Sequence, residues 1–385
     1  MVLAKKKIRV LVVDDSPFIR MTLKKILSMD SDIEVLDTAR DGKEGIYKIQ
    51  LLKPDVVTMD VEMPVMNGLQ ALEEIMRWQP VPVIILSSVT TEGAKLTMKA
   101  LELGAVEVVA KPSGNHGDDL FTLSQDIVLK VKIAACVDPA RLRKRSMENS
   151  GFIAKLSKST EKIKSSYILG NTDDGEQAKK RNNPKMIRKL PNKPVEIVAI
   201  GTSTGGPSAL QSVLQKLPAE FSVPVIVAQH MPAGFTVTLA NRLNGICKIN
   251  VKEVENGEVL KAGTVYIGEA GKQFQVKRKN NQLVAVVTSE SPIATLYKPS
   301  VDVMFMSLAS EVGGGVVGVV MTGMGNDGLK GMKELKAQGA FAVAESEKTC
   351  IVYGMPRVIV EAGYADRIEL LSDIGECIIQ VVARR

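Results

Sequence analysis

The pattern that most constrains this chain is an alternation of short apolar runs with segments of helical periodicity, which occurs in two blocks. The first block covers residues 1–137 and the second covers residues 194–385. Strands that alternate with helices favour a mainly parallel sheet with helices on both faces. Residues 138–193 are polar and charged, with few apolar side chains to support a core. The 385-residue chain is therefore expected to contain two α/β domains joined by a linker.

The formal net charge of +7 belongs to the linker and not to either block. Residues 138–193 carry 15 Lys and Arg against 6 Asp and Glu, whereas residues 1–137 carry 17 against 19 and residues 194–385 carry 18 of each. Because neither block is basic, a nucleic-acid-reading domain is not expected. The basic linker has two open interpretations, a solvated tether or a patch that docks on an acidic partner.

Three observations predict a cytoplasmic protein without membrane insertion. A run of about 18 apolar residues does not occur. The N-terminal sequence MVLAKKKIRVLVV passes from a lysine cluster into a strand-like run without a signal-peptide cleavage pattern. The four cysteines are scattered without a CxxC pair, which favours free thiols in a reducing compartment: Cys136, Cys247, Cys350 and Cys377.

The first block has the element pattern of a flavodoxin-like domain. Its predicted strands are residues 8–13, 33–36, 55–59, 83–86 and 106–109. Helical patterns follow Ser16-Pro17 and cover residues 43–51, 69–78 and 92–103, with Gly104 as the C-cap of the last helix. Ligands of such a domain bind at the carboxyl ends of its strands.

Acidic, hydroxyl and basic side chains follow these strands. Asp14 and Asp15 follow the first strand, Asp60 the third, Ser87 the fourth and Lys111 the fifth. Three converging carboxylates repel each other and favour a hard cation with oxygen ligands, most simply Mg²⁺. Beside a metal, a hydroxyl and a lysine, Asp60 is equipped to attack a phosphoryl group. Strand-terminal acids also serve as helix N-caps. Here, however, acidic, hydroxyl and basic side chains follow the ends of four strands of one predicted sheet, which favours the phosphoryl site.

The motifs VLVVDDSPFIR, TMDVEMPVMNGLQAL, VIILSS and VAKP resemble those of response-regulator receiver domains and cover the whole block. The resemblance implies a phospho-acceptor at Asp60, a phosphate-sensing hydroxyl at Ser87 and a phosphate-binding lysine at Lys111. The implied Mg²⁺ ligands are three carboxylates and one backbone carbonyl: Asp14, Asp15, Asp60 and Glu62. Many receivers carry an aromatic residue three positions before the lysine, where this chain has Val108. That departure counts against a signal through a rotating ring but not against phosphorylation.

The second block opens with a predicted strand at residues 195–200 that runs into Gly201-Thr202-Ser203-Thr204-Gly205-Gly206-Pro207 and a helical pattern. One interpretation is a phosphate cradle at a helix N-terminus, although G-x-G-x-x-G and Gly-Lys-Ser/Thr are both missing here. The other is a G-x-S-x-G nucleophile turn, which would expose Ser203 on a tight bend with backbone N–H groups available to an oxyanion.

A serine nucleophile needs a base and an orienting acid. His230 follows the predicted strand 223–228 and is the one histidine of the second block. Asp327 follows the predicted strand 316–321, and its ordinary role would be the N-cap of the helix that begins at Gly328. Residues 249–287 predict strands and a hairpin beside the parallel core, to which we assign no chemistry.

The motifs GTSTGG, QHMP and MTGMGNDG resemble those of the CheB family of chemotaxis protein-glutamate methylesterases, and the order receiver, linker, catalytic domain is that of the family. The resemblance implies a doubly wound parallel-sheet esterase domain with Ser203 as nucleophile, His230 as general base and Asp327 as orienting acid. Backbone groups at Thr204 and Met324 are the implied oxyanion donors, and the esterase reaction needs no cofactor.

The resemblance also implies a biological setting. The substrate would be the glutamate γ-methyl esters of methyl-accepting chemotaxis receptors, hydrolysed to glutamate and methanol at receptor arrays in the cytoplasm. A chemotaxis histidine kinase would be the phosphodonor, and phosphorylation would loosen a receiver that packs over the Ser203 face. Deamidation of receptor glutamines passes through a similar tetrahedral centre; the sequence leaves that activity open.

Two other functional classes fit parts of the sequence. A response regulator with a nucleic-acid-binding output would share the first block, but the neutral second block has no recognition-helix motif. A phosphate- or nucleotide-binding module would use GTSTGG as a cradle. Replacing Ser203 by alanine separates the last case from an esterase, because phosphate binding would survive the change.

Overall fold

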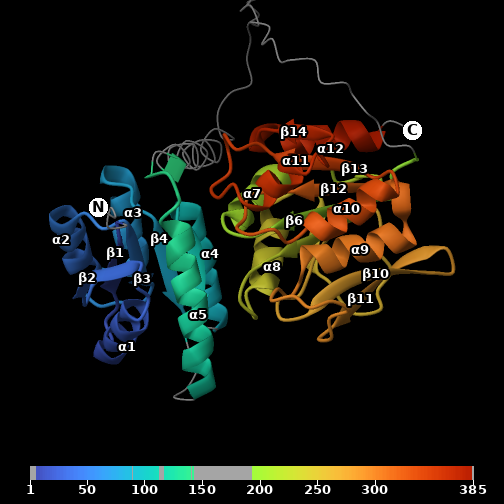
Figure 1. The fold of residues 1–385 in the computed structure, drawn as a ribbon. Helices are drawn as coiled ribbons and strands as arrows, with labels where there is room; N and C mark the ends of the chain where they lie inside the picture. Colours follow the sequence, from blue (N-terminus) through green and yellow to red (C-terminus); the bar gives the residue numbers. More distant parts are fainter. Residues whose placement is uncertain (1–5, 89, 112–116, 140, 143–192, 384–385) are drawn as a thin grey trace, which may run out of the picture.

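The protein is described here by a computed structural model that covers residues 6–88, 90–111, 117–139, 141–142 and 193–383. It forms two α/β domains, with the receiver-like domain in blue to green and the second domain in yellow to red (Figure 1). Most of the predicted linker lies outside the described residues, as do the two ends of the chain. None of the described helices combines the length and the apolar character that crossing a bilayer requires.

The first domain is a five-stranded parallel sheet with the strand order β2-β1-β3-β4-β5. Its strands are β1 (Ile8–Val13), β2 (Ile33–Ala39), β3 (Val56–Asp60), β4 (Val83–Ser87) and β5 (Glu107–Ala110). Its helices are α1 (Pro17–Ser28), α2 (Gly42–Leu52), α3 (Gly68–Trp78), α4 (Thr91–Leu103) and α5 (Gly117–Ala134). This order is that of flavodoxin-like domains, so the predicted fold class is confirmed.

Local capping explains where these helices begin and end. The Ser16 and Asp41 side chains accept hydrogen bonds from the first turns of α1 and α2, and Asn67 forms a capping box with Gln70 at α3. Helix α4 ends at Gly104, whose φ of 113° is left-handed, as the sequence predicts for a glycine C-cap.

The second domain is a seven-stranded parallel sheet with the order β14-β13-β12-β6-β7-β9-β8. Its strands are β6 (Ile197–Thr202), β7 (Val225–Gln229), β8 (Asn250–Glu253), β9 (Thr264–Ile267), β12 (Val316–Val320), β13 (Phe341–Glu345) and β14 (Arg367–Glu369). Its helices are α7 (Gly206–Leu214), α8 (Thr236–Ile246), α9 (Val301–Glu311), α10 (Leu329–Ala337), α11 (Met355–Glu361) and α12 (Leu371–Ala383), with a 3₁₀ turn, η2 (Gly313–Gly315), before β12.

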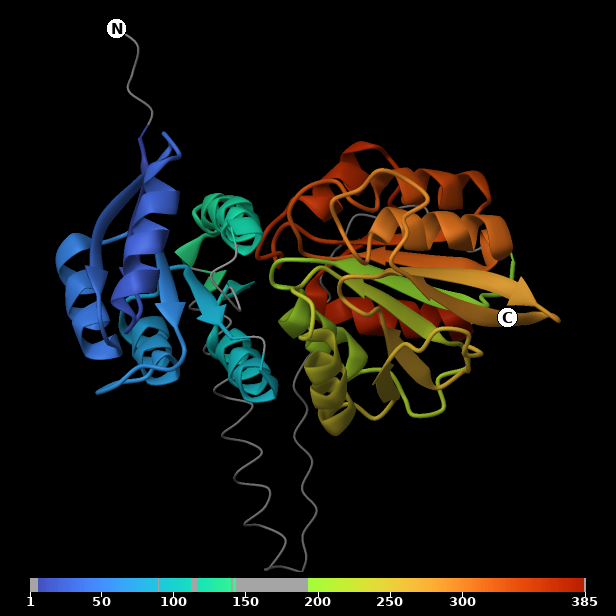
Figure 2. The same ribbon diagram turned by 90° about the horizontal axis from the view of Figure 1, so that it is seen from below.

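Both faces of this sheet are buried, because side chains alternate along each strand and helices cover both sides (Figure 2). On β6, Val198 and Ile200 pack into the core on the α7, α8 and α12 side. Ile197 and Ala199 pack into a separate core on the α9 and α10 side. The near-continuous apolar run of this strand is therefore what a doubly covered parallel strand requires.

The middle of the second block differs in part from its prediction. Strands β8 and β9 join the parallel sheet beyond β7 rather than lying outside it. The short, buried run Thr264–Ile267 has the apolar character of a core strand, which the prediction of a side structure overlooked. The hairpin itself is present, because β10 (Gln273–Lys279) and β11 (Gln282–Thr288) pair antiparallel around Asn280-Asn281, whose φ values of 48° and 62° fit a two-residue hairpin turn.

The two domains pack against each other on the α4 side of the first domain (Figures 1 and 2). Glu107 of β5 also contacts the second domain. Helix α4 lies beside α7 and α8 of the second domain. The Ser208 hydroxyl donates to the Leu101 carbonyl at 3.4 Å, and Arg242 on α8 forms an ion pair with Glu102 on α4. Arg141, in the predicted linker, donates to the Cys350 carbonyl at 2.8 Å. The receiver-like domain therefore contacts the edge of the second domain that carries the GTSTGG turn.

Candidate active site and phosphorylation site

Three neighbouring strands bring the candidate catalytic residues to one edge of the second sheet. Strand β6 lies between β12 and β7, so the order of winding reverses at β6, where ligands bind in open α/β sheets. Ser203 follows β6, His230 follows β7, and Asp327 lies in the loop after β12. Thr202 is in register with Gln229, so Ser203 and His230 leave the sheet on adjacent strands.

The imidazole of His230 is held from two sides. Its Nε2 atom lies 2.8 Å from Oδ2 of Asp327, and the ring of Tyr297 stacks on it with a centroid separation of 4.1 Å. The Nδ1 atom is buried and has no hydrogen-bond partner among the described residues. The ring nitrogen that remains available to accept a proton is therefore Nδ1. Ser203 and this nitrogen do not form a hydrogen bond here, which is common before substrate binds.

Asp327 is fixed by the N-terminus of α9. Its Oδ2 accepts from the Val301 amide at 2.7 Å, and its Oδ1 accepts from the Asp302 amide at 3.0 Å and from the Ser300 hydroxyl at 2.8 Å. Burial by itself would raise the pKa of Asp327, but the hydrogen bond and charge of His230 and these amide donors hold the pKa below its usual value. Asp327 is thus a carboxylate already aimed at the imidazole.

The ordinary role predicted for Asp327, the N-cap of the helix after Gly328, is wrong. Asp302 on α9 takes that role, because its Oδ1 accepts from the Gly328 amide at 3.0 Å and from the Gly331 amide at 2.8 Å. The two helix N-termini are therefore capped crosswise, each by a carboxylate from the other segment. The Oδ2 atom of Asp327 therefore contacts both the Val301 amide and Nε2 of His230.

The turn that carries Ser203 is held on both sides. The Ser203 amide donates to the Thr322 carbonyl at 3.0 Å, and the Ser203 carbonyl accepts from the Gly206 amide and from the Gln229 side chain at 2.8 and 3.0 Å. The next loop approaches closely, because a Cβ added to Gly323 would lie 2.8 Å from the Ser203 Cβ. The glycine-rich loops thus allow the candidate nucleophile Ser203 and the loop after β12 to come into contact.

Two backbone amides near Ser203 have no hydrogen-bond acceptor among the described residues. Neither the Thr204 N–H nor the Met324 N–H donates to another group in the described part of the chain. The Thr204 hydroxyl, in contrast, donates to Oε2 of Glu107 at 2.6 Å, and both side chains are buried. A residue next to the candidate nucleophile is therefore bonded to the first residue of β5 in the other domain.

The structure brings together four of the residues predicted for the phosphorylation site. One carboxylate oxygen from each of Asp14, Asp15 and Asp60 lies within 4.8 Å of the other two. The Lys111 ammonium lies 2.9 Å from Asp14 and 2.7 Å from Asp60. Such an oxygen-only donor set suits a hard divalent cation, so the chemistry of these residues fits Mg²⁺.

Two further predicted residues lie at this site with different contacts. The Ser87 hydroxyl donates to the Gly93 carbonyl on α4 at 3.1 Å and not to Asp60. The Glu62 amide donates to Oδ1 of Asp60 at 3.4 Å, while its side chain is exposed. The roles of Ser87 as phosphate sensor and of the Glu62 carbonyl as metal ligand stay predictions.

Burial and charge set the ionisation of this cluster. Burial raises the pKa of Asp14, with the Asp60 charge acting in the same direction and the Lys111 ammonium against it. Burial would lower the pKa of Lys111, but the hydrogen bond to Asp60 and the charges of both carboxylates outweigh it and raise that pKa. The cluster carries more negative than positive groups, which is the condition under which a divalent cation binds.

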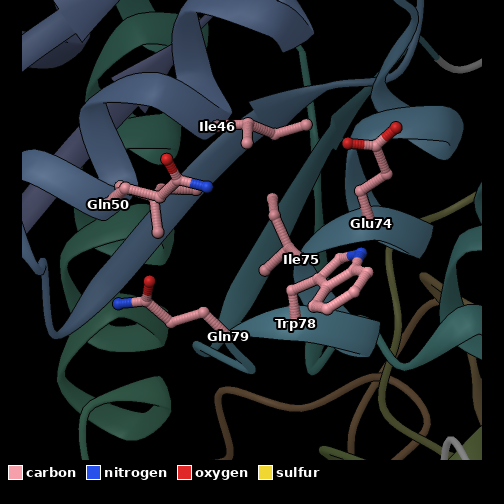
Figure 3. Close-up of a pocket in the computed structure, with 7 residues that line it drawn as sticks. Ile46, Gln50, Glu74, Ile75, Trp78 and Gln79 are labelled. Atoms are coloured by element: carbon pink, nitrogen blue, oxygen red, sulfur yellow. The ribbon is translucent and has the colours of Figure 1, made fainter.

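A pocket of about 200 Å³ in the first domain lies between α2 and α3 (Figure 3). Ile46 and Gln50 reach it from α2, while Ile75 and Trp78 reach it from α3. Its lining has no nucleophile–base pair and no acidic cluster. We place no chemistry in this pocket.

Sequence reasoning missed three residues of the site. Tyr297 and Ser300 lie in a loop without a motif, and Glu107 lies in a predicted strand whose contacts are in another domain. The one signal was Ser300 before a helical pattern, which is typical of an N-cap. Nothing local to Tyr297 or Glu107 indicates a neighbour so distant in the sequence.

Two family models match parts of this chain. Residues 198–378 match the CheB methylesterase family model, and residues 10–121 match the response regulator receiver domain model. The protein-glutamate methylesterase/protein-glutamine glutaminase of Desulfitobacterium hafniense (strain Y51) is 56% identical over 393 residues, which cover 99% of each chain. That of Lawsonia intracellularis (strain PHE/MN1-00) is 43% identical over 371 residues, which cover 96% of this chain and 97% of the relative.

Among solved structures, the catalytic domain of Thermotoga maritima CheB methylesterase is 38% identical, covers 49% of this chain and 100% of its own, and has a TM-score of 0.48. With 56% identity to a curated relative over nearly the full length of both chains, the chain belongs to the protein-glutamate methylesterase/protein-glutamine glutaminase family.

Proposed function

We propose that this protein is a phosphorylation-regulated serine esterase that hydrolyses glutamate γ-methyl esters on methyl-accepting chemotaxis receptors. The observation that carries the proposal is the His230–Asp327 contact of 2.8 Å. It leaves the buried Nδ1 without a hydrogen-bond partner among the described residues, on the strand end adjacent to the one that carries Ser203. A serine, a histidine with one free nitrogen and a fixed carboxylate form the machinery of acyl transfer.

In the first half of the reaction, Ser203 Oγ attacks the ester carbonyl carbon while His230 Nδ1 accepts the hydroxyl proton. The Asp327 carboxylate, bound at Nε2, stabilises the imidazolium that forms. We assign stabilisation of the oxyanion of the tetrahedral intermediate to the Thr204 and Met324 amides, which donate to no other group among the described residues. The intermediate collapses with loss of methoxide, which takes the proton from His230 and leaves as methanol.

In the second half, His230 removes a proton from water, and the resulting hydroxide attacks the Ser203 acyl ester. Collapse of this second intermediate returns the proton to Ser203 and releases the receptor glutamate. A glutamine side chain would follow the same route with ammonia as the leaving group, so the site also supports deamidation.

The N-terminal domain, residues 1–137, is the switch in this proposal. The Asp60 carboxylate attacks a phosphoryl group from a chemotaxis histidine kinase, and Lys111 neutralises charge on the transferred phosphoryl oxygens. Asp14, Asp15 and Asp60, with the Glu62 carbonyl, would hold Mg²⁺, which neutralises phosphoryl charge when it is bound. Ser87 would then turn from Gly93 towards the phosphoryl group.

Regulation follows from the contact between the domains. In the unphosphorylated chain, α4 and β5 pack against the α7–α8 edge, and Glu107 is bonded to Thr204 beside the nucleophile. Phosphorylation at Asp60 would loosen this contact and open residues 194–385, the catalytic domain, to a receptor helix at a cytoplasmic array. Residues 138–193 would act as the linker that keeps the domains together.

A methanol-release assay tests the proposal. A methylated receptor fragment is incubated with the full chain, with and without a small-molecule phosphodonor and Mg²⁺. We expect methanol release in both cases and a faster rate with the phosphodonor, and chelation of Mg²⁺ should remove only the increase. A chain that releases no methanol would contradict the esterase activity. A rate that does not change with the phosphodonor would contradict the regulation.

A further inference from the structure

The ring of Tyr297 covers one face of the His230 imidazole. The two rings are 4.1 Å apart between centroids and only 2° from parallel. A Cβ added to Gly325 would lie 3.3 Å from the Tyr297 hydroxyl oxygen, so Tyr297 spans from the histidine to the loop that carries Met324. The side chain therefore lies between two parts of the proposed active site.

Tyr297 is anchored by the hairpin to which the sequence assigned no chemistry. Gln273, at the start of β10, is fully buried, and its Nε2 donates to the Tyr297 carbonyl at 2.9 Å. Its Oε1 accepts from the Ser300 amide at 2.9 Å, directly before α9. One buried side chain thus fixes both the Tyr297 loop and the helix N-terminus that binds Asp327.

When His230 accepts the Ser203 proton, the protein must stabilise the imidazolium that forms. The His230 side chain is only 9% exposed, so water contributes little to stabilising the imidazolium form. Among the described residues, the charged or titratable groups that face it are Asp327 from the β12–α10 loop, Asp302 of α9 behind Asp327, and Tyr297. The face of a tyrosine ring is electron-rich and attracts a cation held within about 6 Å of its centroid.

We infer that Tyr297 is a positioning residue for the His230 base, whose ring face orients the imidazole and stabilises the imidazolium formed when Ser203 loses its proton. Asp327 acts in the plane of the imidazole through Nε2, whereas Tyr297 acts on its face and leaves Nδ1 free. This inference rests on the proposed role of His230, so its test includes a measurement that needs no substrate.

The chain has only two histidines, so a His116→Gln background isolates the ring signals of His230 in nuclear magnetic resonance. In the full chain, Tyr297→Phe keeps the ring and removes the hydroxyl, and Tyr297→Leu removes the ring. Pentafluorophenylalanine at position 297 keeps the shape of phenylalanine but reverses the charge distribution of the ring. The measurements are the pH titration of the His230 ring, and kcat and KM for methanol release from a methylated receptor fragment.

With leucine or the fluorinated ring, we expect the His230 titration to move to lower pH by about half to one unit. We expect kcat to fall about tenfold with KM unchanged, because the imidazolium forms after substrate binds. Tyr297→Phe should match the native chain in both measurements. An unchanged titration in the fluorinated variant, or a phenylalanine variant as impaired as the leucine one, would overturn the inference. If the native chain released no methanol, the proposed function would be wrong. The pH titration of the His230 ring would still test whether the Tyr297 ring stabilises the imidazolium.

Discussion

The Thr204 hydroxyl and the Glu107 carboxylate form a buried 2.6 Å hydrogen bond across the boundary between the two domains. Thr204 directly follows the proposed nucleophile, and Glu107 begins β5. Lys111 follows the other end of β5 and contacts Asp60 at 2.7 Å. A single short strand therefore connects the proposed phosphorylation site with the proposed active-site turn.

Replacing Glu107 by alanine should raise the basal esterase rate of the unphosphorylated chain. A hydrogen bond to a carboxylate stabilises a contact by about 1.5–3 kcal/mol, so we expect an increase of about tenfold or more in methanol release without a phosphodonor. Glu107→Gln keeps a hydrogen-bond acceptor, so its basal rate should lie between those of the native chain and Glu107→Ala. Glu73→Ala, on the exposed side of α3, is the matched control. A Glu107→Ala chain with the native basal rate would rule out this bond as a restraint.

Gly323→Ala should remove most of the esterase activity while leaving the chain folded. The new methyl group would lie 2.4 Å from Met355 Sδ and 2.8 Å from Ser203 Cβ. The flexible methionine can move aside, but Ser203 must shift. A displacement of the order of 1 Å at the reacting atom reduces rates about 100-fold. The measurements are kcat and circular dichroism.

Gly245→Ala is the control for that variant. Gly245 lies in α8, and a Cβ there would meet no atom of the described residues within 4 Å. Alanine in an open helical position should raise the free energy of unfolding by about 0.5–1 kcal/mol with activity unchanged. Equal losses of activity in both glycine variants would show that crowding at Ser203 is not the cause.

Most of the fold was predictable because it depends on residues that are close in the sequence. Alternating apolar runs identify β6 and β7, Gly104 marks the end of α4, and Asn280-Asn281 marks the hairpin turn. The candidate catalytic residues followed from the same logic, because the ends of parallel strands share one edge of a sheet.

Contacts between distant segments were not predictable in this way. Thr204 and Glu107 are 97 residues apart in the chain, and no periodicity indicates that their elements meet. The same holds for Tyr297 above His230, and for Asp327, whose carboxylate caps α9 although it lies beside α10 in the sequence. Such contacts depend on tertiary packing, which local sequence patterns do not indicate.

Asp327 should make the second domain sensitive to acid. Its pKa in the folded chain lies below the ordinary value of 3.8, so its stabilising effect is complete above that value and is lost as the pH falls through the folded pKa. Asp327→Asn should lower the stability of α9 at pH 7 by about 2 kcal/mol and flatten its pH dependence below pH 4. Hydrogen exchange of the α9 amides measures both, with exposed Asp373→Asn as control. An unchanged acid profile in Asp327→Asn would contradict this account.

Lys111→Gln should destabilise the first domain and make it respond to Mg²⁺. Removing the ammonium leaves the buried carboxylates of Asp14 and Asp60 without their cation, which costs about 3 kcal/mol. Trp78 is the only tryptophan in the chain, so its fluorescence in urea reports unfolding of this domain. Added Mg²⁺ should stabilise Lys111→Gln more than the native chain, whereas exposed Lys43→Gln should behave as native. Equal effects of Mg²⁺ on all three chains would argue against a metal site at these carboxylates.

In the proposed function, Ser203 attacks a glutamate methyl ester and the receiver controls this step. Both parts are tested by methanol release from a methylated receptor fragment, measured for the native chain, Ser203→Ala and Ser212→Ala, each with and without a phosphodonor. Ser212, in the second turn of α7, is the control for loss of a hydroxyl in the same segment. We expect Ser203→Ala to release no methanol in either condition, while its Asp60 still accepts phosphate. Ser212→Ala should keep the native basal rate and the native increase in rate with the phosphodonor. Methanol release by Ser203→Ala at the native rate would contradict the account.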